Sequence, residues 1–317
     1  MFARLFSESG LSLDRLRSLV EVGAAGSIAQ AAGGDPVKQS QYSRQIKELE
    51  EFFRTTLLER YGKGVRFTAN GRELARISRF LMMGLSNFQR GCLGEQRTYR
   101  IGASPSFIQT FLLPLLSAPS TLQSGIRFAV EALPDDLIEQ RLHELLLDFG
   151  VVTRPTLSRP LQSRKLLSWH LRLFVPAHSQ ESAKKIMRKL KEKQFGFTLA
   201  AETPSPWFAL LSEFGPALIC HNFLEARSIL EQQQIPSFLP DFIACDFPSG
   251  HVSCLSFPFD RLENLRTVKN ERSGSGRRAR QPFQYSLSWN PRLLRLNPQA
   301  VRQLEWLQKE LSQRIGA

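Results

Sequence analysis

The sequence lacks most of the features that mark secreted, membrane-spanning or zinc-binding proteins. Its four cysteines are scattered without a Cys-x-x-Cys pair, which disfavours a disulfide framework and a zinc cluster and favours buried thiols. The chain starts without a charged segment followed by a long apolar run, so we expect no secretory signal. The longest apolar stretch, Phe107–Leu116, is about half as long as a membrane span and contains Pro114. We therefore expect a soluble, cytoplasmic chain that does not enter a membrane.

Motifs of catalysis are missing as well. The chain has no Gly-x-x-x-x-Gly-Lys phosphate loop, no His-Glu-x-x-His pair and no Gly-x-Ser-x-Gly turn. Cys220 and His221 are adjacent, but neighbours in a strand point to opposite faces, which disfavours a nucleophile and base pair. His143 falls within a predicted amphipathic helix and is expected to be structural. We therefore expect no enzyme, no cofactor and no metal.

What the sequence does have is a large excess of basic residues. It carries 42 Lys and Arg against 29 Asp and Glu in 317 residues, a formal net charge of +13. The excess lies at the two ends, with 16 basic against 10 acidic residues in 1–100 and 12 against 4 in 261–317. A near-neutral middle between basic ends indicates a ligand-handling body joined to a module that meets a polyanion, either nucleic acid or a membrane surface.

The first ninety residues read as helices with one hairpin. Apolar residues recur at helical spacing, and glycines or capping residues mark the ends of each run. The predicted elements are a helix from Leu13 to about Gly23, a short helix Ser27–Ala32, a third helix from about Val37 to Phe53, a hairpin over 59–68 and a long helix from Arg72 to about Phe88.

From Tyr99 onward, predicted strands alternate with predicted helices, which indicates an α/β body with a largely parallel sheet. We expect a helical unit over 1–70, a linker helix over 71–96, and an α/β body over 97–317. Residues 269–280 are almost free of apolar side chains and read as an exposed basic loop of unassigned role.

Helix, glycine-containing turn, helix and basic hairpin is the order of a winged helix-turn-helix. Gly26–Ala32, followed by Val37–Glu50, resembles the DNA-binding helices of LysR-type transcriptional regulators without a gap, and Leu57–Thr68 with Gly71 resembles their wing. A weaker resemblance continues through Arg100–Ala103 and later segments. It implies an α/β protein with an N-terminal all-α winged helix-turn-helix that binds DNA, over 1–70, and a two-lobed effector domain like a periplasmic binding protein, over 97–317. The implied lobes are about 97–171 with 290–317, and 172–289.

The third helix carries polar side chains outside its apolar stripe, so it can offer amide and guanidinium groups to a major groove. The resemblance implies that residues at its start and outer face contact DNA, and that basic residues of the wing approach the backbone or minor groove. The matching positions are Lys38, Gln39, Ser40, Ser43, Arg44, Lys63 and Arg66.

The start of this helix departs from the family pattern at three positions. Asp35 replaces an apolar residue, Lys38 replaces a capping Ser or Thr, and Ser40 replaces a Pro. Loss of an oxygen cap costs about 0.5–2 kcal/mol. We expect Asp35 to cap the helix instead, with Pro36 at its first position, so that the helix starts earlier.

The resemblance also implies an effector site between the two lobes. Ser104 and Ser106 follow a predicted strand and open a helix, where hydroxyl and N–H groups can hold an anion. Thr153 lies near the hinge, and Thr203 lies where the second lobe of the family contacts ligand. We expect these four residues to bind a small-molecule effector, with a carboxylate as the expected chemistry.

These observations predict a sequence-specific, DNA-binding transcriptional regulator that is modulated by a small-molecule effector. The stripe Leu74, Ile77, Leu81 and Leu85 predicts that the linker helix pairs protomers, in a dimer or a tetramer. Two alternatives from other classes stay open: a solute receptor like a periplasmic binding protein, disfavoured by the missing signal and the basic first module, and an enzyme acting in the α/β cleft.

Overall fold

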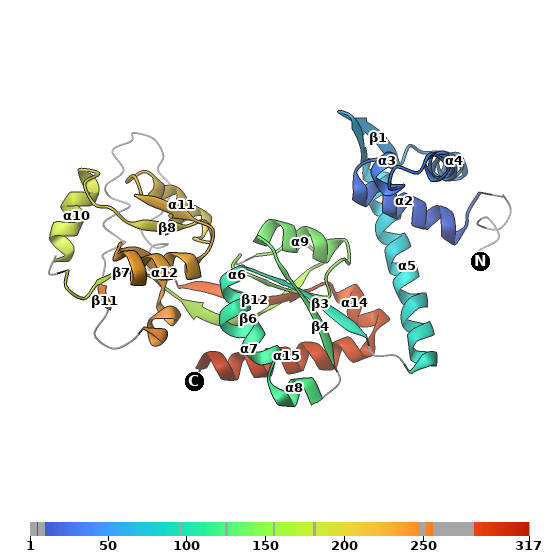
Figure 1. Cartoon of the computed structure of the whole chain (residues 1–317). Coiled ribbons are helices and arrows are strands. Elements are labelled where there is room, and N and C mark those ends of the chain that lie inside the picture. Colours follow the sequence, from blue (N-terminus) through green and yellow to red (C-terminus); the bar gives the residue numbers. More distant parts are fainter. Residues whose placement is uncertain are drawn as a thin grey trace.

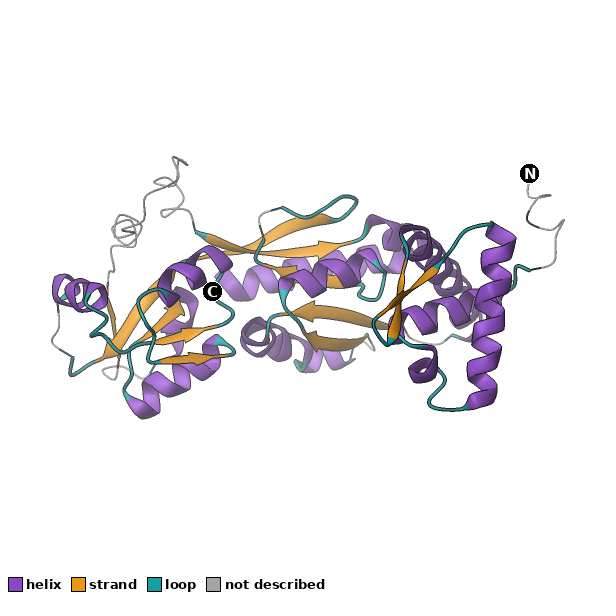
Figure 2. Cartoon of the chain, turned by 90° about the horizontal axis from the view of Figure 1, so that it is seen from above, coloured by secondary structure: helices purple, strands orange, loops and turns teal. Residues whose placement is uncertain are grey.

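The structure is a computed structural model that describes residues 5, 10–94, 97–123, 126–154, 156–179, 182–247, 252–255 and 282–316. The molecule is elongated, with a helical N-terminal domain at one end and two α/β lobes following it (Figures 1 and 2). The long helix α5 leads from the N-terminal domain to the first lobe. The predicted loop 269–280 lies outside the described residues.

The N-terminal domain has the order of elements that the sequence predicts: three helices, a two-stranded hairpin and a long helix. The elements are α2 (Leu13–Ala25), α3 (Ile28–Ala31), α4 (Pro36–Phe53), β1 (Leu58–Tyr61), β2 (Gly64–Phe67) and α5 (Ala69–Leu93). Local sequence signals set the ends of α2, because the Ser12 hydroxyl accepts the Arg15 N–H and Gly26 ends the helix at a φ of 68°. Leu19, Leu49 and other leucines form the small core.

The hairpin is fixed against the helices at two points. The Val65 N–H donates to the Gly26 carbonyl at 2.8 Å, which ties the wing to the turn between α2 and α3. At the start of α5, a Cβ on Gly71 would lie 1.9 Å from the Leu57 carbonyl oxygen, so only glycine allows this approach. These contacts hold the wing beside the helices without a large core.

The first lobe is a five-stranded sheet in the order β4-β3-β5-β12-β6. Its strands are β3 (Thr98–Ala103), β4 (Arg127–Ala132), β5 (Phe149–Val152), β6 (Gln162–Trp169) and β12 (Phe283–Trp289). Its helical segments are α6 (Pro105–Phe107), a π-helical turn η1 (Ile108–Leu112), α7 (Leu113–Leu116), α8 (Pro119–Gln123), α9 (Asp135–His143), α14 (Pro291–Leu296) and α15 (Pro298–Gly316).

The second lobe is a five-stranded sheet in the order β11-β7-β10-β8-β9. Its strands are β7 (Leu171–Pro176), β8 (Thr198–Ala200), β9 (Leu218–Cys220), β10 (Ser237–Pro240) and β11 (Val252–Leu255). Its helices are α10 (Ala183–Lys191), α11 (Ser205–Ser212), α12 (Phe223–Gln233) and a 3-10 turn η2 (Asp241–Asp246).

Two sequence-based expectations about the sheets are wrong. Each sheet is mixed rather than largely parallel, because β12 runs antiparallel to β5 and β6, and β7 runs antiparallel to β10 and β11. The strand Phe283–Trp289 belongs to the first sheet, whereas the expected lobe boundary assigned these residues to the second lobe. The chain therefore returns to the first lobe before Phe283 and not at residue 290.

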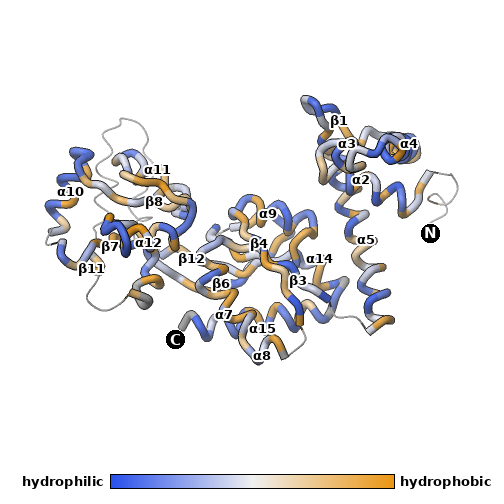
Figure 3. The backbone as a smooth tube through the Cα atoms, viewed as in Figure 1, coloured by the Kyte–Doolittle hydropathy of each residue, from blue (hydrophilic) through white to orange (hydrophobic). Residues whose placement is uncertain are grey.

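One continuous apolar core joins the two lobes. It contains buried side chains from both sheets, including Ile101 and Trp169 of the first and Leu173 and Phe238 of the second. Figure 3 shows the apolar segments gathered along the strands of both lobes, with hydrophilic stretches on the outer helices. The polar residues expected to bind an effector therefore lie against a largely apolar joint.

Candidate DNA-binding and effector-binding sites

Helix α4 begins where the sequence predicts a shifted start. The Asp35 carboxylate accepts the N–H of Val37 at 2.9 Å and of Lys38 at 3.3 Å, and Pro36 is the first helical residue. The predicted replacement of the missing cap by Asp35 is confirmed. On the inner side of α4, Ile46 and Leu49 are buried, so the opposite side faces outward.

Most of the residues predicted to contact DNA lie on this outer side. Lys38, Ser40, Ser43 and Arg44 are exposed, whereas Gln39 is half-buried. The Arg44 Nε lies 3.5 Å from a Glu48 oxygen, but its side chain remains 76% exposed. The helix therefore presents hydroxyl, ammonium and guanidinium donors on one accessible face.

The wing carries the other two predicted residues. Lys63 is exposed at the hairpin turn, next to Gly62. Arg66 is also exposed, but its Nε donates to Glu59 at 2.9 Å and its guanidinium lies 4.7 Å from the centre of the Tyr61 ring. In Figure 1 the wing and α4 project at the same end of the domain, away from the junction of α5 with the first lobe. The elements that carry the two groups of predicted residues therefore lie at one end of the domain.

Sequence reasoning missed Val37 as a member of this surface. Its side chain is 76% exposed beside Lys38, at the start of α4. An exposed apolar residue at the start of a recognition helix can contact the methyl group of thymine. The signal in the sequence was a valine outside the apolar stripe of the helix.

Three of the four predicted effector residues come close together where the lobes meet. Ser104 follows β3, and its hydroxyl accepts the Phe107 N–H at 3.4 Å. Ser106 is fully buried. Thr203 belongs to the second lobe, follows β8 and is 3% exposed. The residue that precedes Thr203 in the chain explains the arrangement.

Glu202, which sequence reasoning missed, reaches from the second lobe to the serines of the first. Its Oε1 accepts the Ser106 N–H at 3.0 Å, and its Oε2 accepts the Phe223 N–H at 3.1 Å. Burial raises the pKa of Glu202, and hydrogen bonds from Ser106, Phe223 and Ser104 partly offset that rise. Nothing in the local sequence distinguishes this glutamate from one in an ordinary loop.

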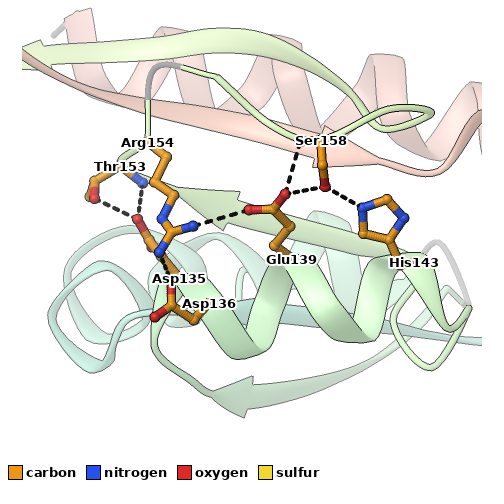
Figure 4. Close-up of polar contacts among 7 residues, drawn as sticks. All are labelled: Asp135, Asp136, Glu139, His143, Thr153, Arg154 and Ser158. Atoms are coloured by element: carbon orange, nitrogen blue, oxygen red, sulfur yellow. Dashed lines mark hydrogen bonds and ion pairs between the residues drawn. The ribbon is translucent and has the colours of Figure 1, made fainter. Parts of the chain in front are cut away.

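Thr153 lies at the carboxyl end of β5, and its polar groups are used elsewhere. Its N–H and its hydroxyl both donate to Asp135 Oδ2, at 2.9 and 2.6 Å (Figure 4). The neighbouring Arg154 forms ion pairs with Asp136 and Glu139 of the same helix, α9. These contacts fix the loop after β5 against α9, so the structure does not join the Thr153 hydroxyl to the Glu202 cluster.

A Ser, His and Glu lie together in the same region without the geometry of a catalytic triad. Ser158 Oγ is 2.6 Å from His143 Nε2 and also donates to Glu139 at 2.5 Å (Figure 4). In a triad the carboxylate holds the far nitrogen of the imidazole, whereas here it contacts the serine. His143 therefore has a structural role, in which it ties α9 to the loop after β5.

Aromatic rings fill much of the space beside Glu202. Phe107 and Tyr285 of the first lobe have ring centres 4.8 Å apart, and Trp169 packs 5.9 Å from Phe223 of the second lobe. The Tyr285 ring is buried, which raises the pKa of its hydroxyl well above the ordinary value. The polar cluster thus sits in a packed, apolar joint that excludes bulk water.

The described residues contain neither a metal-binding cluster nor a membrane-spanning helix. Within the described ranges, no cluster of three or more His, Cys, Asp or Glu side chains has the arrangement of a metal site. No helix in the part of the chain that the structure describes is both long and apolar enough to cross a membrane.

Comparison with known families gives two matches that together span most of the chain. The model of the bacterial regulatory helix-turn-helix proteins of the LysR family matches residues 13–72. The model of the LysR substrate binding domain matches residues 93–279.

Individual relatives agree with these matches. The chain is 28% identical over 147 residues to the HTH-type transcriptional regulator DgdR of Burkholderia cepacia, covering 46% of this chain and 50% of DgdR. It is also 28% identical over 167 residues to the regulator HdfR of Yersinia enterocolitica, covering 52% of this chain and 57% of HdfR. The chain thus spans about half the length of the curated relatives that it matches.

Solved structures share the fold along nearly the whole chain. Full-length OxyR from Pseudomonas aeruginosa has a TM-score of 0.59 at 16% identity, covering 96% of this chain and 95% of that one. Full-length LysG from Corynebacterium glutamicum, solved with bound effector Arg, has a TM-score of 0.59 at 13% identity and covers 92% and 99%. At such low identity these likenesses show the fold alone.

Proposed function

Because the chain belongs to the LysR family of bacterial helix-turn-helix regulators, we propose that it is a transcriptional regulator that binds double-stranded DNA in a sequence-specific manner. The observation that carries the proposal is the outer face of α4, where polar and basic side chains are exposed on a helix whose other face is buried in the domain core. A helix of this kind fits the major groove, and the basic wing beside it meets the flanking backbone.

The roles of single residues follow from their positions. Ser43 and Arg44 lie on the exposed face of α4, and the half-buried Gln39 lies near its N-terminus, so we assign these three to base edges. Lys38 and Ser40, near the positive end of the helix, are placed to meet phosphate or the first base. Lys63 and Arg66 of the wing contact phosphate, and Arg66 exchanges part of its pairing with Glu59 for this contact.

The proposal is tested by selecting duplexes that the full-length protein retains from a random library. A regulator enriches a defined sequence, and its affinity for that sequence falls steeply as salt rises, since each phosphate contact releases counterions. A protein that enriches no sequence, or that retains no duplex at low salt, would refute the proposal. A solute receptor or a cleft enzyme gives that second result.

We further propose that two copies of the chain pair through α5. Its exposed apolar side chains lie along one stripe, and they stay uncovered in the single chain although α5 is 25 residues long. The exposed members are Ile77, Leu81, Leu85 and Phe88. A groove of about 440 Å³ beside the stripe is lined by residues of α2 and α5, among them Leu13 and Leu85. A second copy would cover this apolar surface.

The joint between the lobes is the proposed effector site. Ser104, Ser106 and Thr203 lie there, whereas the hydrogen bonds of Thr153 go to Asp135. The Thr203 hydroxyl and the Trp169 indole N–H are buried without a hydrogen-bond partner among the residues that the structure describes. Buried polar groups are nearly always paired, so a ligand that pairs them gains affinity. The N–H groups of Ser106 and Phe223 suit an oxyanion, which is the effector chemistry that we expect from the sequence. The Glu202 carboxylate already supplies such an oxyanion.

A further inference from the structure

We propose that Glu202 is a built-in carboxylate ligand that occupies the anion-binding position between the lobes and latches them together. The inference rests on the proposed effector site and concerns the chemistry which that site accepts. It replaces the expected free carboxylate with one that belongs to the chain.

Two backbone N–H groups donate to the Glu202 carboxylate. Oε1 accepts the Ser106 N–H and Oε2 accepts the Phe223 N–H, so each oxygen faces a backbone donor. Ser106 is the second residue of the helical run that begins at Pro105, and Phe223 is the first residue of α12. The carboxylate therefore lies between the positive ends of two helical segments, one from each lobe, which is the setting that a bound carboxylate ligand would occupy.

The contacts around Glu202 also cross between the lobes. Glu202 follows β8 of the second lobe, whereas Ser106 follows β3 of the first, 96 residues earlier in the chain. The Phe223 N–H also donates to Ser106 Oγ at 3.0 Å, so hydrogen bonds cross the joint in both directions. Ser106, Glu202 and Phe223 thus form a closed set of hydrogen bonds that holds one lobe against the other in the absence of any ligand.

The charge of the Glu202 carboxylate also limits what can bind beside it. Glu202 has no ion pair among the interactions of the described residues, so its neighbours compensate it through dipoles alone. A second carboxylate brought to this position would compete for the same N–H groups and would face like-charge repulsion. The effector that pairs Thr203 and Trp169 therefore contributes neutral or cationic groups, and a simple carboxylate does not bind the native protein here.

The test is chemical rescue of the full-length protein. Glu202→Ala removes one CH₂ and the carboxyl group, which together have the size and charge of acetate. We expect the variant to melt at a lower temperature than the native protein. Sodium acetate should then raise its melting temperature in proportion to the logarithm of its concentration, by about 1–2 °C at a few times Kd for a protein of this size. Sodium chloride at equal ionic strength should give no such rise.

Two proteins serve as controls. The native protein should show no acetate-specific shift, because its own carboxylate fills the position. Glu192→Ala, which removes an exposed glutamate at the end of α10, should behave as the native protein does. If Glu202→Ala does not fold in chloride, its yield on refolding from urea should be several-fold higher in acetate than in chloride.

An equal acetate shift in the native protein would overturn the inference, because the anion position would then be free. A folded Glu202→Ala that responds identically to acetate and chloride would also overturn it, as would equal refolding yields in the two salts. The readout contains no DNA, so such a failure is separate from a failure of the regulator proposal, which the duplex selection measures.

Discussion

At the scale of single residues, the start of the recognition helix depends on Asp35. Its carboxylate satisfies two N–H groups that no carbonyl of the helix can reach, and it lies one turn before the Lys38 ammonium, whose charge opposes the helix dipole. The departure from the family pattern at Lys38 is therefore compensated three residues earlier.

Replacing this cap should lower stability by a predictable amount. Asp35→Ala should reduce the free energy of unfolding of the N-terminal domain by about 0.5–2 kcal/mol, measured by urea denaturation. Asp35→Asn keeps a side-chain oxygen at the cap, so its free energy of unfolding should fall by only a small part of that amount. Equal losses in both variants would show that charge, and not the cap hydrogen bonds, sets the helix start.

Glu202 gives a second residue-scale prediction, through pH. Because its pKa is raised in the folded protein, the unfolded chain releases this proton first as pH rises above about 4.5. The stability that the protonated group contributes is complete below that pH and is lost as pH rises through the folded value. Tyr285 and Cys220, the titrating groups coupled to it, have pKa values raised to about 11 or beyond and stay neutral in this window.

Glu202→Gln should remove this component of the pH profile. The difference in unfolding free energy, native minus Glu202→Gln, should decrease between pH 4.5 and 7 in urea melts. The variant should also be less stable overall, since its NH₂ group faces either the Ser106 or the Phe223 N–H. A pH-independent difference would contradict the assigned direction of the pKa shift.

At the scale of elements, α5 carries more exposed large apolar side chains than any other helix that the structure describes. Its inner residues, such as Ala75 and Ser78, are buried in the N-terminal domain, whereas Leu81 and Leu85 are 45% and 49% exposed. A helix with an apolar stripe on its outer side is stabilised when a partner packs against that stripe.

Charging the stripe should separate the protomers. Leu81→Glu combined with Leu85→Glu should convert a dimer or larger assembly to a monomer in light scattering at micromolar concentration, because two buried carboxylates oppose pairing. Arg72→Glu with Arg90→Glu adds two acidic groups at exposed polar positions on the other side of the helix and should leave the assembly intact. A native protein that is already monomeric would contradict the pairing.

The elements also show how far sequence reasoning reaches in this chain. The helices of the N-terminal domain, including the start of α4, could be predicted because Ser12, Gly26 and Asp35 act on backbone groups only a few residues away. The pairing of β12 with β5 and β6 could not, since it joins segments more than a hundred residues apart. Glu202 could not be predicted for the same reason, because its role depends on contacts with Ser106 and Phe223, which are distant in the sequence.

At the scale of the whole molecule, the linker helix is attached to the first lobe by polar contacts. The Arg97 guanidinium donates to Asn87 of α5 at 3.1 Å and forms a buried ion pair with Asp148, at the edge of β5. Arg79 of α5 lies 3.6 Å from Glu144, at the end of α9. These pairs provide a physical link between the effector domain and the helix that presents the DNA-binding domain.

The central claim is that α4 and the wing read and hold DNA. It is tested most directly by titrating Gln39→Ala, Lys38→Ala and Arg66→Ala with a selected duplex and a scrambled one over a salt series. Gln39→Ala should lose about 1–3 kcal/mol on the selected duplex only and relax discrimination at one position. Arg66→Ala should weaken both duplexes alike and lower the salt slope by roughly one unit. Lys38→Ala should resemble one of these two patterns. Three variants that bind both duplexes as the native protein does would contradict the account.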